Sequence, residues 1–325
     1  MDVMQKRWSA NIALIFVLVV IFAAVQVGID SGLLSDYLLT SVFLIGINII
    51  LASSLNLING FTGEFSLGHA GFMAVGAYVG AVITVKLGLP FPLAIICGML
   101  ATALAGLLVG LPTLRLKGDY LAIATLGFGE IIRVILVNIE YVGGARGILG
   151  IPRVVNWPIL FCAVVLSVLL IRNFICSTHG RACLAIREND LAASMMGINV
   201  TFYKVLAFVI GASLAGLAGV LYAHYFYIIQ PAKFSFLLTF DVLVMVMVGG
   251  LGSLTGSVVG AVLLTILSTA LQAIPELRMV LYALLLITSA VFRPQGLLGE
   301  KELTLHIFKR WGGVFGAAAH REQAQ

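Results

Sequence analysis

Long apolar runs dominate the chain, and short polar segments separate them. The runs occupy residues 12–28, 38–57, 66–87, 91–111, 121–139, 157–174, 204–226, 237–248, 254–271 and 277–292. Most approach the length of about 20 apolar residues with which a helix crosses the hydrocarbon core of a membrane, and the eighth run is the shortest. The pattern predicts an all-α, polytopic transmembrane helical bundle of about ten spans.

Composition supports a membrane protein rather than a soluble domain. Of the 325 residues 61% are hydrophobic and 10% are charged, and the mean hydropathy is +1.12. The net charge of +5 is explained by orientation signals, so nucleic acid is not an expected partner. The first run follows Lys6 and Arg7 as a signal peptide would, but it is long and lacks a clean cleavage site, so we expect a retained span.

The basic residues favour one orientation, since cytoplasmic loops carry an excess of Lys and Arg. With both termini in the cytoplasm, the inside set has thirteen members: Lys6, Arg7, Arg115, Lys117, Arg172, Arg181, Arg187, Lys204, Arg293, Lys301, Lys309, Arg310 and Arg321. The outside set has five: Lys86, Arg146, Arg153, Lys233 and Arg278. This orientation places the central polar loop, about 175–203, in the cytoplasm.

The central loop contains the signals of a short helix. Asn189 is a good N-cap, Asp190 places negative charge in the first turn, and Gly197 suits the left-handed residue that ends a helix. The predicted helix is about two turns long. Its apolar face consists of Leu191, Ala192, Met195 and Met196, and Arg181 and Arg187 lie upstream.

Two interpretations of this helix stand at about even weight. Because methionine adapts to irregular surfaces, a face with Met195 and Met196 suits a groove on a soluble partner. Alternatively, the helix packs back on its own membrane bundle.

Two glycine-rich stretches lie in opposite halves of the chain. The first, 55–81, contains Gly63, Gly68 and Gly71, and the second, 249–260, contains Gly249 and Gly252. Glycines allow close helix packing and the broken helices that line substrate sites, so these residues are pathway candidates and favour an internal inverted repeat. His69 is another candidate, although a histidine hydrogen-bonded to a neighbouring helix is at least as good an interpretation.

Glu130 and Arg133 lie three residues apart inside an apolar run, so on a helix they share one face and can neutralise each other. They could bind the two charges of an amino acid, which makes them pathway candidates. We favour the other interpretation, an internal ion pair that holds helices together.

Several kinds of chemistry are missing from the sequence. There is no GxxxxGK[ST] phosphate-binding loop, no nucleophile arrangement and no metal-ligand spacing. The four cysteines, Cys97, Cys162, Cys176 and Cys183, are interpreted as packing thiols. We therefore expect a non-enzymatic chain without cofactor or metal, and any ATP-driven step requires another polypeptide.

The segment 180–222, GRACLAIRENDLAASMMGINVTFYKVLAFVIGASLAGLAGVLY, resembles the branched-chain amino acid permease family of the LivH/LivM type. LAASMMG resembles the coupling-helix motif of ABC importer permeases, with Leu191 where the strict motif has Glu and with Glu188 three residues earlier. The glycine-rich stretch 55–81 and FRPQGLLGEK near the end also resemble this family, so the resemblance covers about 44–299.

The resemblance implies a permease subunit of a heteromeric importer in a bacterial inner membrane. Its expected partners are a second related permease, two cytoplasmic subunits that bind ATP and Mg, and a periplasmic protein that delivers leucine, isoleucine or valine. The permease domain would comprise 1–300, with 301–325 as a cytoplasmic tail. The expected ATPase-coupling residues are Arg181, Arg187, Glu188, Asp190, Leu191, Ala192, Ala193, Met195, Met196 and Gly197.

Other functions stay open at this point. Permeases for urea and short-chain amides share this sequence style. An ion-coupled carrier would show more intramembrane carboxylates than Glu130 alone, and a membrane scaffold would not need the glycine-rich stretches.

Overall fold

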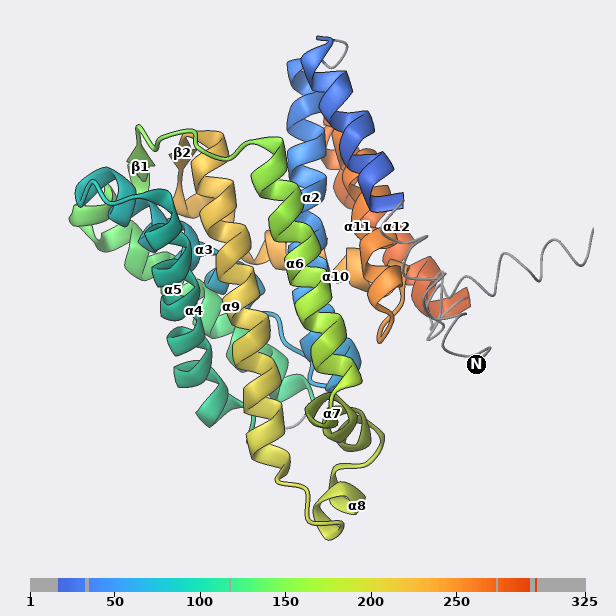
Figure 1. The fold of residues 1–325 in the computed structure, drawn as a ribbon. Coiled ribbons are helices and arrows are strands. Elements are labelled where there is room, and N and C mark those ends of the chain that lie inside the picture. Colours follow the sequence, from blue (N-terminus) through green and yellow to red (C-terminus); the bar gives the residue numbers. More distant parts are fainter. Residues whose placement is uncertain (1–16, 33–34, 117, 273, 293–295, 297–325) are drawn as a thin grey trace, which may run out of the picture. The chain divides into compact units, whose positions relative to one another are not determined.

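A computed structural model describes residues 17–32, 35–116, 118–272, 274–292 and 296 (Figure 1). The start of the first expected span and the expected tail, 301–325, lie outside the described residues. Residues 40–300 belong to one compact unit, and all packing reported below lies within it. The helix Val17–Asp30 belongs to a separate unit and coincides with the described part of the first predicted span.

Helices make up nearly all of the described chain. The long ones are α2 (Asp36–Asn56), α3 (His69–Ala81), α4 (Phe91–Thr113), α5 (Asp119–Asn138), α6 (Trp157–Cys176), α9 (Val200–Phe226), α10 (Phe236–Gly249), α11 (Leu254–Ala270) and α12 (Pro275–Phe292). Wide π-helical turns extend α2 through Leu57–Phe61 and α3 through Val82–Lys86. Prolines at the first turns of α4 and α6 set the start of these helices, because proline fits there without losing a hydrogen bond.

The helices lie where the apolar runs predicted them, within a few residues at each end. Among the described residues, six helices are long and apolar enough to cross a membrane: those over Asp36–Phe61, His69–Lys86, Phe91–Thr113, Asp119–Asn138, Trp157–Cys176 and Val200–Phe226. The helices Val17–Asp30, Phe236–Gly249 and Leu254–Ala270 are apolar but shorter. The polytopic all-α class is confirmed, while the count of ten spans and the inverted repeat stay predictions.

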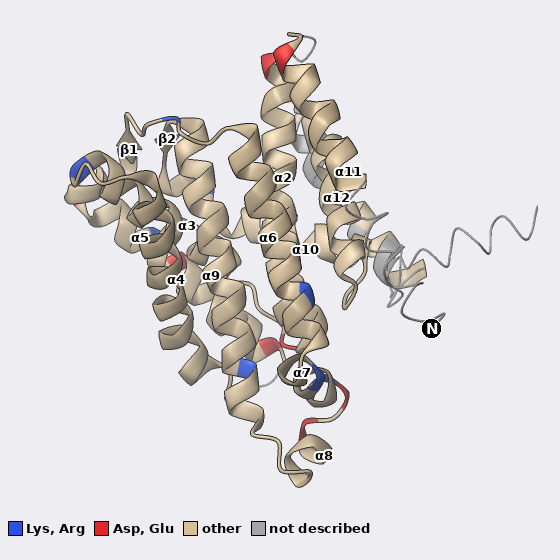
Figure 2. Ribbon diagram, viewed as in Figure 1, with Lys and Arg blue, Asp and Glu red and all other residues tan. Residues whose placement is uncertain are grey.

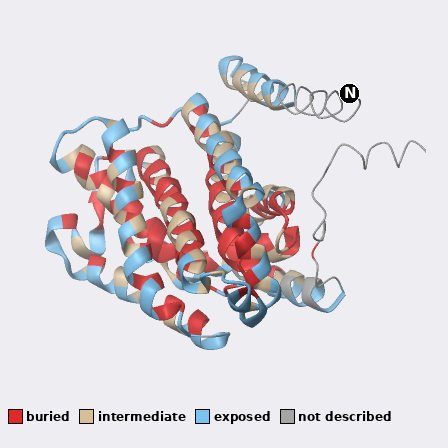
Figure 3. Ribbon diagram, turned by 60° about the horizontal axis from the view of Figure 1, so that its bottom comes forward, coloured by how far each residue is buried: buried red, intermediate tan, exposed pale blue. Residues whose placement is uncertain are grey.

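The core of residues 40–300 centres on α2, α3 and α9, most of whose residues are buried (Figure 3). Glycines bring α3 and α9 close together: a Cβ on Gly76 would lie 2.3 Å from the Gly216 carbonyl oxygen. The outer helices α5 and α6 are apolar and have few buried residues, as expected of surfaces that face lipid.

Two features of the connections were not predicted. The polar loop contains a second helix, α7 (Thr178–Glu188), before the short helix α8 (Asp190–Met195). The other feature is a two-residue antiparallel ladder between β1 (Ile148–Leu149) and β2 (Ile228–Ile229), with Ile148 opposite Ile229. Figure 1 shows α7 and α8 at one end of the unit and the β1–β2 ladder at the opposite end.

Charged residues gather at the ends of the helices and in their connections (Figure 2). This distribution suits an apolar environment around the middle of each helix, where an isolated charge is costly. Glu130 and Arg133, on α5, are an exception because they lie inside a helix.

Candidate functional site

The short helix α8 has the predicted caps. The Asn189 side-chain oxygen accepts a hydrogen bond from the Ala192 backbone N–H at 3.0 Å, and Gly197 has φ +83° just after the helix. Upstream, the Ser177 hydroxyl oxygen caps α7 by accepting from the Gly180 N–H at 3.3 Å. Two well-defined helix starts therefore present α8 at the end of the unit, next to α7.

The apolar face of α8 points away from the rest of the chain. Leu191, Met195 and Met196 are 67%, 85% and 82% exposed, whereas Ala193 is buried. The alternative in which these methionines pack on their own bundle is therefore wrong for this structure. These exposed side chains form an adaptable apolar surface, which we call the α8 face.

An irregular segment, 62–68, separates α2 from α3, as the glycines of the first stretch predicted. Side chains of other helices satisfy the backbone here: the Thr125 hydroxyl accepts from the Leu67 N–H at 2.9 Å, and in the first turn of α3 the Ala70 N–H donates to the Thr239 hydroxyl at 3.0 Å. Such satisfaction is required of non-helical backbone inside a membrane protein.

Gly68 and Gly71 serve close packing against α5. A Cβ on Gly71 would lie 2.8 Å from the Gly129 Cα, and a Cβ on Gly68 would lie 2.7 Å from the Thr125 carbonyl oxygen. Neither glycine lines the cavity described below. Both glycines therefore allow α5 to pack closely against the start of α3, and their place in the pathway stays a prediction.

The two glycine-rich stretches meet at a polar junction. Asn56, in the last turn of α2, donates to the Ser253 carbonyl at 2.9 Å and to the Ser257 hydroxyl at 2.6 Å, and it accepts from the Gly252 N–H at 2.9 Å. Asn56 is fully buried. We call these four residues the Asn56 junction; the sequence did not single out Asn56.

Arg187 connects this junction to the α8 face. Its guanidinium donates to the Gly60 carbonyl at 3.0 Å. The same side chain packs against both glycine-rich stretches, since a Cβ on Gly63 would lie 2.9 Å from its Cγ and one on Gly252 would lie 2.7 Å from its Nη1. Arg187 lies in the last turn of α7, the helix that precedes α8. Its side chain therefore connects α7 to both glycine-rich stretches.

An ion pair lies nearby. Glu64, in the irregular segment, pairs with Lys204 in the first turn of α9, and both side chains are 11% exposed. Arg181 and Glu188 are exposed, and Glu188 pairs with Arg187 at 3.0 Å. The end of the unit with α7 and α8 is therefore held by charge-assisted contacts.

Glu130 and Arg133 form the ion pair that their spacing predicted. Arg133 Nε lies 2.6 Å from Glu130 Oε2, while Glu130 Oε1 accepts from the Phe236 N–H at 3.1 Å at the start of α10. The pair therefore links α5 to α10, which supports the structural interpretation.

His69 is likewise engaged within the core. It is 1% exposed, and its Nε2 lies 2.8 Å from the Ser54 hydroxyl on α2. This contact matches the alternative of a histidine hydrogen-bonded to a neighbouring helix. It is not one of the residues that line the cavity.

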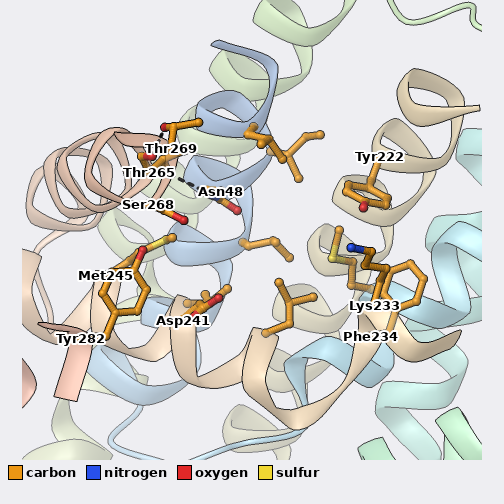
Figure 4. Close-up of a pocket in the computed structure, with 16 residues that line it drawn as sticks. Asn48, Tyr222, Lys233, Phe234, Asp241, Met245, Thr265, Ser268, Thr269 and Tyr282 are labelled. Carbon is orange, nitrogen blue, oxygen red and sulfur yellow. Dashed lines mark hydrogen bonds between the residues drawn. The ribbon is translucent and has the colours of Figure 1, made fainter. Parts of the chain in front are cut away.

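A cavity of about 190 Å³ lies between α2, α9, α10 and α11 (Figure 4). Its apolar lining includes Leu51, Met73 and Met245, and its polar lining includes Asn48, Tyr222, Lys233, Asp241 and Ser268. Figure 4 shows Asn48, Asp241 and Ser268 on one side, with Tyr222 and Lys233 across from them. None of the pathway candidates chosen from the sequence lines this cavity.

The cysteines differ in their surroundings. Cys183 is buried between α7 and α9, where its thiol lies 3.8 Å from the Tyr203 carbonyl, and burial raises its pKa to about 11. Cys183 is thus a neutral packing thiol, as predicted. Cys97 is half-buried, whereas Cys162 and Cys176 are exposed, so packing within this chain does not explain those two. The described residues contain no cluster of metal ligands.

These features define a polytopic helical membrane protein with an exposed apolar helix face and an internal cavity. The family "Branched-chain amino acid transport system / permease component" matches residues 37–290, and the chain belongs to this family. It is therefore a transport subunit rather than a catalytic one.

Similarity to individual proteins agrees with this family. The "High-affinity branched-chain amino acid transport system permease protein LivM" of Salmonella typhimurium is 35% identical over 287 residues, covering 78% of this chain and 68% of the relative. LivM of Escherichia coli is 35% identical over 288 residues with the same coverage. The Escherichia coli permease protein LivH is 34% identical over 154 residues, 46% of this chain and 48% of LivH.

Proposed function

We propose that this chain is the membrane-spanning subunit of an ATP-driven importer for leucine, isoleucine and valine. Family membership and similarity to the LivM proteins support the transport of branched-chain amino acids. A second permease related to LivH would complete the membrane part, and two cytoplasmic subunits would bind ATP and Mg. A periplasmic protein would deliver the substrate, and the chain would lie in the inner membrane with both termini inside.

The observation that carries the coupling function is the exposed α8 face. Leu191, Met195 and Met196 form an apolar surface on a capped helix, and nothing else in the described chain covers it. Adaptable methionines suit a groove on an ATPase subunit. Movement of α8 would reach the Asn56 junction through α7 and Arg187, which contacts Gly60.

Replacing Met195 and Met196 by Asp tests this function. The docking face would then carry two charges that have to be desolvated against the partner, so we expect ATP-driven leucine uptake to fall to background. Because both side chains are exposed, membrane insertion and the amount of chain should stay unchanged. The measurement is uptake of labelled leucine together with quantitation of the chain in membranes.

The matched control is Met195→Leu with Met196→Leu, which preserves the apolar character of the face and should retain most of the uptake. Normal uptake in the double Asp variant would contradict the coupling function.

A further inference from the structure

The cavity of Figure 4 has the lining of an amino acid site. It carries one cationic side chain, Lys233, and one anionic side chain, Asp241, with an amide, Asn48, on the same side as the anion; much of the remaining lining is aliphatic. A lining of balanced charge does not favour a cation or an anion. It does suit a zwitterion whose remaining surface is apolar.

Asn48 is held in a defined orientation. Its Nδ2 donates to the Thr265 hydroxyl at 2.9 Å, and Thr265 in turn donates to the Ala261 carbonyl at 2.6 Å. With the amide nitrogen engaged, the Asn48 carbonyl oxygen is left as an acceptor on the cavity side (Figure 4). An ammonium group, which only donates hydrogen bonds, fits an acceptor beside a carboxylate.

Lys233 supplies the opposite polarity. It lies in the turn Pro231–Phe234 between α9 and α10, and its side chain is exposed, so it is positioned at the opening of the cavity rather than in its depth. An ammonium group there would receive a carboxylate through a charge-assisted hydrogen bond.

The volume limits the size of the ligand. One water molecule, with its single non-hydrogen atom, needs about 10–15 Å³ of cavity volume. The cavity of about 190 Å³ therefore holds on the order of a dozen non-hydrogen atoms. A short aliphatic amino acid fits within this limit. Its side chain would lie against Leu51, Met73 and Met245.

Asn48, which lines the cavity, and Asn56, which forms the junction, lie on the same helix, α2. Asn48 and Asn56 are eight residues apart on α2, about 12 Å along the axis. Asn56 is buried and forms hydrogen bonds with Gly252 and Ser253, so the chain is closely packed at the junction.

We propose that this cavity binds the substrate during translocation, with Lys233 on the carboxylate, Asn48 and Asp241 on the ammonium group, and the aliphatic wall on the side chain. The proposal rests on the proposed function and adds the location of the site and its polarity. A neutral substrate such as urea or a short-chain amide would have no use for Lys233.

The test uses the complete importer in liposomes, with ATP inside and leucine-loaded binding protein outside. Lys233→Cys should lower leucine uptake at least tenfold, because a charge-assisted hydrogen bond is lost. Treatment with aminoethyl methanethiosulfonate restores a cation at this position and should recover most of the uptake. Methyl methanethiosulfonate attaches a neutral group and should not.

Two controls accompany the test. Lys86→Cys removes another exposed lysine that does not line the cavity and should transport normally with either reagent. The native complex is treated with each reagent separately, which measures any effect of modifying the exposed native cysteines Cys162 and Cys176. Binding-protein docking, measured by pull-down, should be the same for Lys233→Cys and the native chain.

The proposal is overturned if Lys233→Cys transports normally, if the two reagents act alike, or if the variant loses docking of the binding protein. If the untreated native complex fails to take up leucine with ATP, the proposed function itself is wrong. The two failures are therefore distinguishable.

Discussion

At the scale of single residues, Arg187 connects α7, the helix next to the α8 face, to the glycine-rich stretches of the core. Its guanidinium donates to the Gly60 carbonyl and packs beside Gly252. A side chain at Gly252 would collide with this guanidinium, and its φ of +78° is a conformation that favours glycine. The bonded partners lie 127 positions apart in the sequence.

Replacement of Arg187 by Met should uncouple the importer. Methionine preserves an unbranched side chain but leaves the Gly60 carbonyl without its donor, at a cost of about 1–3 kcal/mol if no water replaces it. We expect leucine uptake to fall at least tenfold while ATP hydrolysis by the assembled complex continues. Both activities are measured on the same proteoliposome preparation.

Arg181→Met is the matched control, since Arg181 is an exposed arginine of the same helix, and it should couple normally. Equal coupling in the two variants would show that the Arg187 contact does not transmit the motion.

Residue-level predictions from the sequence succeeded where the interaction is local. Asn189 and Gly197 were identified as the ends of α8 because capping depends on neighbours within three or four positions. Asn56 could not be identified this way, since it bonds with Gly252 across 196 positions. Only its polarity inside an apolar run could have drawn attention to it.

At the scale of elements, helix α7 shows what a search for apolar runs misses. It is only eleven residues long, and its buried residues include Ala182, Cys183 and Ile186, which recur at helical spacing within an otherwise polar loop. The Ser177 cap was a local signal that could have identified it. The span helices were placed correctly because their apolar runs are long.

The Glu130–Arg133 pair belongs to this scale because it links α5 to α10. Replacing both residues by Gln removes the charges together and leaves an acceptor near the Phe236 N–H. Both side chains are about 30% exposed, so we expect a loss of about 1 kcal/mol or less in stability and leucine uptake within twofold of the native value. Uptake and the thermal stability of the purified complex are measured side by side.

Loss of uptake in a double Gln variant that assembles fully would instead place the pair in the translocation pathway. Glu130→Ala alone provides a comparison, because it leaves Arg133 and the Phe236 N–H without their partner and should destabilise the chain more than the double variant.

At the scale of the whole molecule, three features of residues 40–300 bear on transport: the cavity lined by Asn48, the buried Asn56 junction, and Arg187 in the helix next to α8. We propose that ATP-dependent movement of α8 opens the junction and lets the substrate leave the cavity. The sequence predicted the class, the positions of the helices and the short helix α8. It could not predict the cavity, because its lining comes from helices far apart in the chain.

The central claim, that this chain is a permease subunit of an ATP-driven importer, is tested most directly by purifying the tagged native complex in mild detergent. The proteins that accompany the chain are identified by mass spectrometry, and leucine uptake is measured after reconstitution with and without ATP. We expect a second permease and two ATP-binding subunits, with uptake that requires both ATP and the binding protein. Purification of the chain alone, with leucine transport driven by an ion gradient and independent of ATP, would contradict the account.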